Sequence, residues 1–277
     1  MSDAAVPDPW FELRRHTAAR IALGRAGNSL PTAEWLRFAE AHALARDAVH
    51  TALQVDGLME ALRTHGFGEP VVLESAAPDR ATYLRRPDLG RRLSARSDAL
   101  LQAAGPGPAC ELAVVLADGL SAAAVDAHAL PLLLALRPRL EADGVIVGPV
   151  AVARQARVAL GDAIGALLQA RAVLVLIGER PGLSSPHSLG AYLTWAPRVG
   201  RSDAERNCVS NIRPEGLQPA AAARTLAWLL AGARRLGATG VTLKDECPHD
   251  GLSVLAVAKV AGCADRLAAP DARQSER

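Results

Sequence analysis

Residues 144–182 decide the fold, and their sequence is GVIVGPVAVARQARVALGDAIGALLQARAVLVLIGERPG. Two runs of small and branched apolar residues flank a segment of helical character, which predicts strand, loop, helix, strand and loop. The second run, Val173–Ile177, is continuously apolar, as expected for a strand that is covered on both faces. The stretch therefore predicts a βαβ unit with parallel strands.

The flanking sequence repeats this alternation. Residues 110–130, CELAVVLADGLSAAAVDAHAL, predict a strand at Leu112–Ala117, a short loop and a helix. Residues 219–246, PAAAARTLAWLLAGARRLGATGVTLKDE, predict a helix and a last strand. We expect the α/β class: a helical N-terminal segment and linker at 1–100, serving subunit assembly, followed by an open, mainly parallel Rossmann-like α/β domain at 101–277.

The N-terminal segment is expected to be helical at 12–25 and at 32–53, with an exposed connector at 75–94. The second helix carries one stripe at spacings of three and four, formed by Trp35, Phe38, Ala39, His42, Arg46, Val49 and Leu53. The first residues of the stripe are apolar, and His42 and Arg46 follow them. A partner surface and the polar edge of an ordinary surface helix would both produce that pattern.

Composition excludes several classes of protein. Half of the 277 residues are apolar but only 3% are aromatic, so alanine, leucine and valine must build the core. The net charge of +2 argues against a nucleic-acid binder. The sequence has no signal peptide, no apolar run long enough for a membrane span and no C-x-x-C pair. We expect a soluble cytoplasmic protein with reduced thiols.

Three loops should meet at one edge, because ligands of open α/β sheets bind beyond the carboxyl ends of the strands. These loops contain Asp118-Gly119, residues 148–162 and residues 178–182. In the last loop, glycines permit close backbone approach and Glu179 could accept hydrogen bonds from an amide or hydroxyl. Solvated turns with a simple Glu–Arg pair would explain the same loop equally well.

Several familiar motifs are absent, including G-x-G-x-x-G, the Walker A loop and the G-x-S-x-G elbow. Residues 126–131, DAHALP, come close to the cobalamin motif D-x-H-x-x-G, but Pro131 replaces the glycine. Asp126 and His128 are also predicted to lie within a helix. They are therefore not expected to form an axial-ligand site.

A dense polar stretch, DAERNCVSNIRPEGL, occupies residues 203–217. Donor side chains that suit amides or phosphate surround Cys208, namely Arg206, Asn207, Asn211 and Arg213. Neighbouring positive charge would favour the thiolate of Cys208 if the thiol is exposed. A buried cysteine beside a structural turn is the alternative, and it is the usual outcome for a cysteine without a paired histidine.

Five stretches together resemble the small (light) subunit family of adenosylcobalamin-dependent ethanolamine ammonia-lyase. They are TAARIALGRAGNSLPT (17–32), AHALARDAVH (41–50), LADGLSAAAV (116–125), LIGERPGLSSPHSLGAYLTWAPR (176–198) and ERNCVSNIRPEGL (205–217). The resemblance implies a non-autonomous subunit of a carbon–nitrogen lyase that converts ethanolamine to acetaldehyde and ammonia. Homolysis of the cobalt–carbon bond of adenosylcobalamin starts that radical reaction.

The resemblance also implies a division of labour. Ethanolamine and most catalytic groups belong to a large subunit, and the small subunit covers the cobalamin at the interface of a hetero-oligomer. Matching motifs carry three cofactor contacts onto this chain: Val158 in RQARVALGD, Glu179 in IGERPG and Cys208 in ERNCVSN. Val158 would pack on the corrin periphery, Glu179 would accept from a corrin amide, and Cys208 would line the pocket without binding cobalt. Packaging in a bacterial microcompartment stays open.

Two other readings compete with this one. A Rossmann-like binding or regulatory subunit outside any cobalamin enzyme would keep the same loop chemistry. A free-standing enzyme would use Glu179 or Cys208 as base or nucleophile. The sequence speaks against the free-standing enzyme, since neither residue has an evident general-base partner.

Overall fold

The computed structural model describes residues 6, 8–105 and 110–248. By contacts between residues, the chain divides after Asp245. The helices and strands described below all belong to the first unit.

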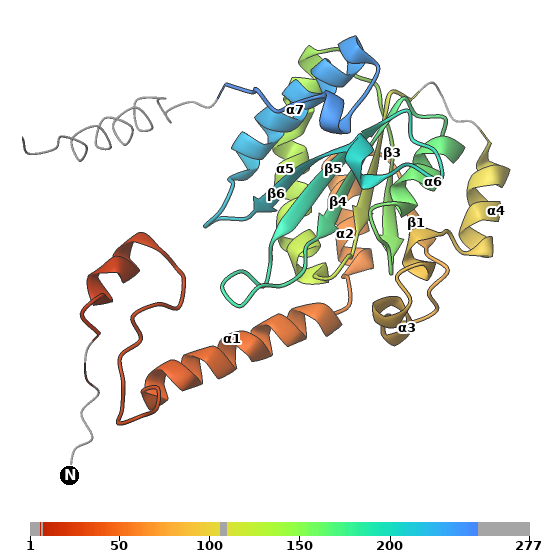
Figure 1. Ribbon diagram of the computed structural model, residues 1–277. Helices are drawn as coiled ribbons and strands as arrows, with labels where there is room; N and C mark the ends of the chain where they lie inside the picture. The colour runs from red at the N-terminus through yellow and green to blue at the C-terminus, as the bar shows by residue number, and fades with distance from the viewer. Residues whose placement is uncertain (1–5, 7, 106–109, 249–277) are drawn as a thin grey trace, which may run out of the picture. The chain divides into compact units, whose positions relative to one another are not determined.

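The described residues form a six-stranded sheet with the order β1-β3-β2-β4-β5-β6 (Figure 1). The strands are β1 (Val71–Glu74), β2 (Leu112–Ala117), β3 (Val147–Arg154), β4 (Ala172–Gly178), β5 (Leu189–Trp195) and β6 (Arg206–Ile212). Neighbours from β1 to β4 are parallel, whereas β5 runs antiparallel to both β4 and β6. The α/β class and the open, mainly parallel sheet expected from the sequence are confirmed.

Helices cover both faces of the sheet. The α-helices are α1 (Thr32–His50), α2 (Val55–Thr64), α3 (Arg80–Arg85), α4 (Ala95–Ala104), α5 (Ala122–Ala142), α6 (Leu160–Leu167) and α7 (Pro219–Leu236). α2, α5 and α7 contribute to one core, and α4 and α6 contribute to the core on the other face. Alternate residues of β2 serve the two cores. The first core contains Leu112, Val114 and Leu116, and the second contains Ala113, Val115 and Ala117.

Two strands lie where the sequence predicted none. β5 and β6 form an antiparallel extension of the sheet, so the loop after β4 spans only residues 179–188. β6 escaped prediction because Asn207, Ser210 and Asn211 are residue types that are rare in strands. The strand expected after α7 is wrong, since Gly240–Thr242 forms the 3₁₀ turn η4.

The N-terminal hundred residues also contribute to the sheet. β1 pairs with β3 and therefore belongs to the α/β architecture. The connector expected at 75–94 contains α3 and the 3₁₀ turn η2 (Leu89–Arg91). It is not simply exposed, because the Tyr83 side chain is buried and its hydroxyl donates to the Ala156 carbonyl oxygen over 3.1 Å. Burial raises the pKa of Tyr83 to about 12.

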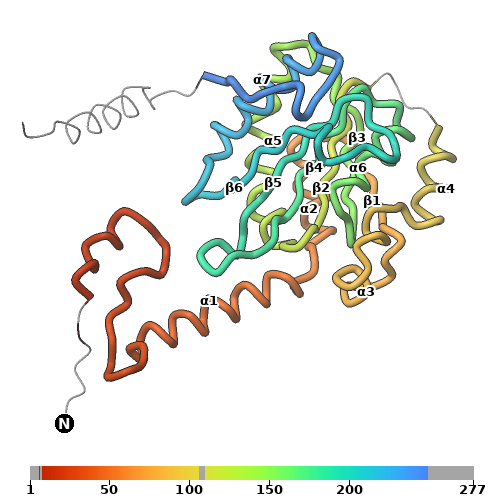
Figure 2. The backbone as a smooth tube through the Cα atoms, viewed as in Figure 1, coloured from red at the N-terminus to blue at the C-terminus, as the bar shows by residue number. Residues whose placement is uncertain are grey.

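α1 is confirmed as a helix, but little of it is covered (Figure 2). Only Ala41 and Ala48 of its residues are buried. The helix predicted at 12–25 is reduced to the 3₁₀ turn η1 (Phe11–His16), which has no buried residue. Large apolar side chains in this segment are exposed: Trp10, Phe11, Leu13, Ile21, Leu30, Trp35, Leu36, Phe38 and Leu44. Within the described residues, no helix is both long and apolar enough to cross a membrane.

Candidate functional site

Asp118 closes the crevice where open α/β sheets usually bind ligands. α5 follows β2 on one face of the sheet and α6 follows β3 on the other, so the crevice lies between the carboxyl ends of β2 and β3. The Asp118 carboxylate, buried at 5% exposure, accepts the backbone N–H of Gln155 over 2.8 Å and that of Ala156 over 3.0 Å. The chain's own carboxylate thus joins the two loops across this crevice.

Arg80 secures the same edge from the side of α3. Its Nε donates to the Val49 carbonyl oxygen over 2.7 Å and its Nη1 donates to the Gly119 carbonyl oxygen over 2.8 Å. Nη1 also lies 3.8 Å from Oδ2 of Asp118. Burial raises the pKa of the Asp118 carboxyl, and its N–H donors and Arg80 oppose that rise. Arg80 therefore fastens the end of α1 to the edge of the sheet.

Gly178 is required by packing inside the protein. A Cβ on Gly178 would lie 1.9 Å from the Ser121 carbonyl oxygen, so β4 and the start of α5 can approach only at a glycine. The Gly178 carbonyl oxygen accepts the N–H of Leu120 over 2.9 Å, which holds the same contact. The expectation that this glycine serves the close approach of a ligand is therefore wrong.

Glu179 follows β4 directly and keeps part of its acceptor capacity free. Its backbone N–H donates to the Ser188 carbonyl oxygen over 2.9 Å. The carboxylate accepts at Oε2 from the Ser188 hydroxyl and, over 3.3 Å, from the backbone N–H of Asn211. Among the described residues no group donates to Oε1. Glu179 is thus oriented by two donors while one oxygen remains available to another molecule.

Glu179 lies over β5 on the face that α6 covers further along the sheet. A Cβ on Gly190 would lie 3.0 Å from Oε1 of Glu179 and 3.2 Å from Cε2 of Tyr192. Gly190 therefore leaves room for the carboxylate and the ring to share this part of the strand. Tyr192 is half-buried and packs on the core beneath α6.

Cys208 lies on β6 opposite Tyr192 of β5, and the residue is exposed. Partial burial of its sulfur raises the pKa of the Cys208 thiol, the hydrogen bond with Tyr192 opposes that rise, and the negative charge of Glu179 adds to it. The expectation of a thiolate favoured by nearby positive charge is therefore wrong. Glu179, Tyr192 and Cys208 lie close enough for their charges to interact, which joins two of the three predicted site residues through Tyr192.

Arg206 does not face a ligand. Its guanidinium pairs with the carboxylate of Asp162 in α6, through Nη1–Oδ1 at 2.6 Å and Nη2–Oδ2 at 2.7 Å. Both side chains are only 2% exposed. This bidentate pair connects α6 to β6 and keeps the charge of Arg206 engaged with Asp162.

The other predicted donors of this stretch are also engaged within the chain. The Asn207 side-chain amide donates to the Leu243 carbonyl oxygen over 2.7 Å and so holds the segment after α7. Nε of Arg213 donates to Oδ1 of Asn211 over 2.7 Å. A general amide- or phosphate-binding cluster around Cys208 is therefore not what these side chains form.

Val158 lies in the loop between β3 and α6, beyond the carboxyl end of β3. It is half-buried and packs on the same apolar core as Tyr192.

Sequence reasoning missed Tyr192, although it stands in the LGAYLTW stretch and is one of only two tyrosines in the chain. The signal would have been the pairing of β5 with β6, which was not predicted. A helical position for Asp126 and His128 is confirmed, since both lie in α5.

Comparison with known proteins gives a consistent family. The family model described as "Ethanolamine ammonia-lyase light chain (EutC)" matches residues 7–244. A protein of Azotobacter vinelandii named ethanolamine ammonia-lyase small subunit is 56% identical over 250 residues, which cover 89% of this chain and 92% of the relative. Proteins of the same name from Pseudomonas syringae pv. tomato and Xanthomonas campestris pv. campestris are 54% and 55% identical. They match over 88% and 89% of this chain and over 85% and 92% of their own lengths.

Proposed function

The chain belongs to the ethanolamine ammonia-lyase light chain family, and we propose from this premise that it covers adenosylcobalamin against a large subunit. The complex would convert ethanolamine to acetaldehyde and ammonia. When bound, adenosylcobalamin supplies the radical chemistry through homolysis of its cobalt–carbon bond. This chain would supply binding and orientation of the cofactor, while the large subunit holds ethanolamine.

One observation carries the cofactor proposal: Glu179, directly after β4, is held in place by Ser188 and Asn211 and keeps Oε1 free of a donor from the described residues. A corrinoid is broad and carries amides around its rim. An amide N–H donated to a fixed carboxylate forms a charge-assisted hydrogen bond, which is stronger than a neutral one. The free carboxylate acceptor at this edge therefore fits the amide donors on the rim of a corrinoid.

The neighbouring residues fit the rest of the molecule. Tyr192, which is half-buried, and Cys208, which is exposed, offer an aromatic ring and a polarizable sulfur beside Glu179. Val158 offers an apolar contact from the loop that follows β3, two strands away from β4. The crevice between β2 and β3 is occupied by Asp118, which leaves the face of β5 and β6 as the place for a flat ligand.

We test this with Glu179→Gln in the complex reconstituted from both subunits. The amide oxygen can keep the hydrogen bonds from Ser188 and Asn211, and the amide nitrogen then turns Oε1 from an acceptor into a donor. Because the lost bond is charge-assisted, the apparent adenosylcobalamin constant in an ethanolamine turnover titration should weaken about tenfold or more. Turnover at saturating cofactor should largely recover.

Glu74→Gln is the matched control. Glu74 ends β1 at the same edge of the sheet and is exposed, so its substitution should leave the cofactor constant unchanged. An unchanged constant in Glu179→Gln would remove Glu179 from the site. A loss of turnover that no cofactor concentration restores would assign Glu179 a direct catalytic role and contradict the proposed division of labour.

The exposed N-terminal segment supports the second part of the proposal, which is docking to the large subunit. Trp10, Trp35 and Phe38 are 67%, 58% and 45% exposed. Several large exposed apolar side chains within one segment are typical of surfaces that a partner covers. Residues 1–100 would then serve subunit assembly, and residues 101–277 would serve cofactor binding. The two segments share the sheet, because β1 of the first segment pairs with β3 of the second.

Substitution tests this docking better than deletion, because removing α1 would also remove the Val49 carbonyl that Arg80 binds. The double variant Trp35→Ser with Phe38→Ser should lower the yield of large subunit that co-purifies. The double variant Val199→Ser with Val241→Ser removes two other exposed apolar side chains, at 79% and 76% exposure, and should not. Equal co-purification of both variants would refute the assignment.

A further inference from the structure

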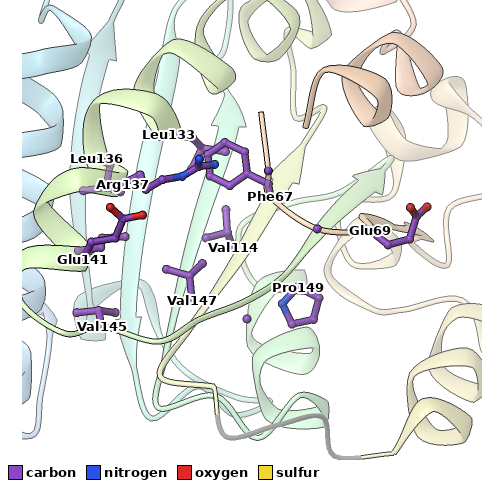
Figure 3. Close-up of a pocket in the computed structure, with 14 residues that line it drawn as sticks. Phe67, Glu69, Val114, Leu133, Leu136, Arg137, Glu141, Val145, Val147 and Pro149 are labelled. Atoms are coloured by element: carbon purple, nitrogen blue, oxygen red, sulfur yellow. The ribbon is translucent and has the colours of Figure 1, made fainter. Parts of the chain in front are cut away.

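A cavity of about 480 Å³ lies at the amino ends of β2 and β3, at the opposite end of the sheet from Glu179 (Figure 3). Small-molecule sites commonly measure about 300–1,000 Å³. Its walls are mainly apolar: Val114 comes from β2, Val147 from β3, and Leu133 and Leu136 from α5. Phe67, from the loop between α2 and β1, adds an aromatic wall.

Arg137 of α5 is the cationic group of this cavity. Its guanidinium carbon lies 3.7 Å from the centroid of the Phe67 ring, and Figure 3 shows the two side chains against each other. Nη2 of Arg137 is buried and has no hydrogen-bond partner. A buried donor without a partner is costly, and an acceptor brought by a ligand would satisfy it. Within the described residues, Arg137 forms no ion pair either.

The local sequence explains this arrangement. Gly66 and Gly68 have φ angles of +72° and +74°, in the left-handed region that glycine tolerates. The chain can therefore turn twice within a few residues and place Phe67 over α5. Glu69 also lines the cavity but is not available to Arg137, because its carboxylate pairs with Arg63 at 2.6 Å.

We propose that this cavity binds an apolar monocarboxylate, with the carboxylate on Arg137 and the hydrocarbon body on the wall formed by β2, β3 and α5. The guanidinium fork matches a carboxylate, and stacking on Phe67 holds its plane in place. A second anionic group on the ligand would meet Glu141, which also lines the cavity, so a dicarboxylate is disfavoured. The inference is independent of the proposed corrinoid site.

Isothermal titration of the full-length chain with octanoate tests the proposal, and octylamine serves as the cationic probe of the same length. Octanoate should bind saturably with one site per chain, and octylamine should not. Arg137→Gln should weaken octanoate binding about tenfold or more, as expected for the loss of a charge-assisted pair. Arg139→Gln removes an exposed arginine of the same helix and should have no effect.

A second variant keeps the positive charge of Arg137 and removes the volume of the cavity. Val147→Phe should fill the cavity and abolish octanoate binding while Arg137 is retained, and a thermal melt checks that each variant is folded. Octanoate binding that survives Arg137→Gln, or equal binding of octylamine, would show an unspecific apolar cavity and overturn the proposal. Binding that survives Val147→Phe, or the absence of saturation up to about 10 mM, would overturn it as well.

Discussion

Asp162→Asn should destabilise the chain strongly, because it leaves the buried Arg206 guanidinium without its main counter-charge. Removing one partner of a buried ion pair typically costs about 3–5 kcal/mol. Here Thr194 Oγ1, at 3.1 Å, and the Arg201 carbonyl oxygen, at 2.9 Å, still accept from the guanidinium. We therefore expect the lower end of that range, about 3 kcal/mol, which corresponds to about 6–12 °C in melting temperature.

Urea unfolding followed by tryptophan fluorescence measures this change. The control is Asp203→Asn, which alters a carboxylate that contacts the same arginine at 3.3 Å but is 90% exposed. Solvent screens that contact, so the control should change stability little. The double variant Asp162→Leu with Arg206→Met removes both charges and should be more stable than Asp162→Asn alone.

Two results would refute this reasoning. If Asp162→Asn is no less stable than Asp203→Asn, the pair does not hold α6 on β6. If the double variant is less stable than Asp162→Asn, the cost lies in lost packing and hydrogen bonds, and not in an unpaired buried charge.

Two further predictions concern a glycine and a carboxylate. Gly178→Ala should destabilise the chain by about 3 kcal/mol or more, since the new Cβ would lie 1.9 Å from a backbone oxygen, whereas Gly182→Ala, whose nearest atom is at 3.3 Å, should be tolerated in the same urea assay. Glu205, which accepts from Ser202 and pairs with Arg201, has its pKa lowered to about 2. Its contribution to stability is therefore present above the unfolded value of about 4.3 and lost as pH falls through about 2. Glu205→Gln should flatten the decline of the urea midpoint over that interval, and an unchanged slope would contradict the assignment.

The strands that are buried on both faces can be predicted from the sequence. β6, which is partly exposed, cannot. Leu112–Ala117 and Val173–Ile177 are recognisable because every residue must be apolar between two layers of helices. β6 has polar side chains for which tertiary contacts decide the conformation. Asn207 lies in a strand because its side chain bonds the Leu243 carbonyl, a contact that no local pattern contains.

The candidate site was predictable to the same extent. Glu179 could be placed at the end of a strand, since the apolar run before it fixes that end. The neighbourhood of Cys208 could not be derived, because it depends on the register that sets Tyr192 opposite the cysteine. The charge of Arg206 was visible in the sequence, but its partner Asp162 lies 44 residues earlier and belongs to another element.

The strand order determines when the nascent chain can begin to assemble its sheet. β1 pairs only with β3, and β2 lies between β3 and β4, so in the described chain neither of the first two strands has a neighbour during early synthesis. The ribosome must release residues up to about Arg154 before any two strands can pair. Until then the apolar strand β2 is exposed to solvent. Translation of β3 is thus the step that ends the period of greatest exposure to aggregation.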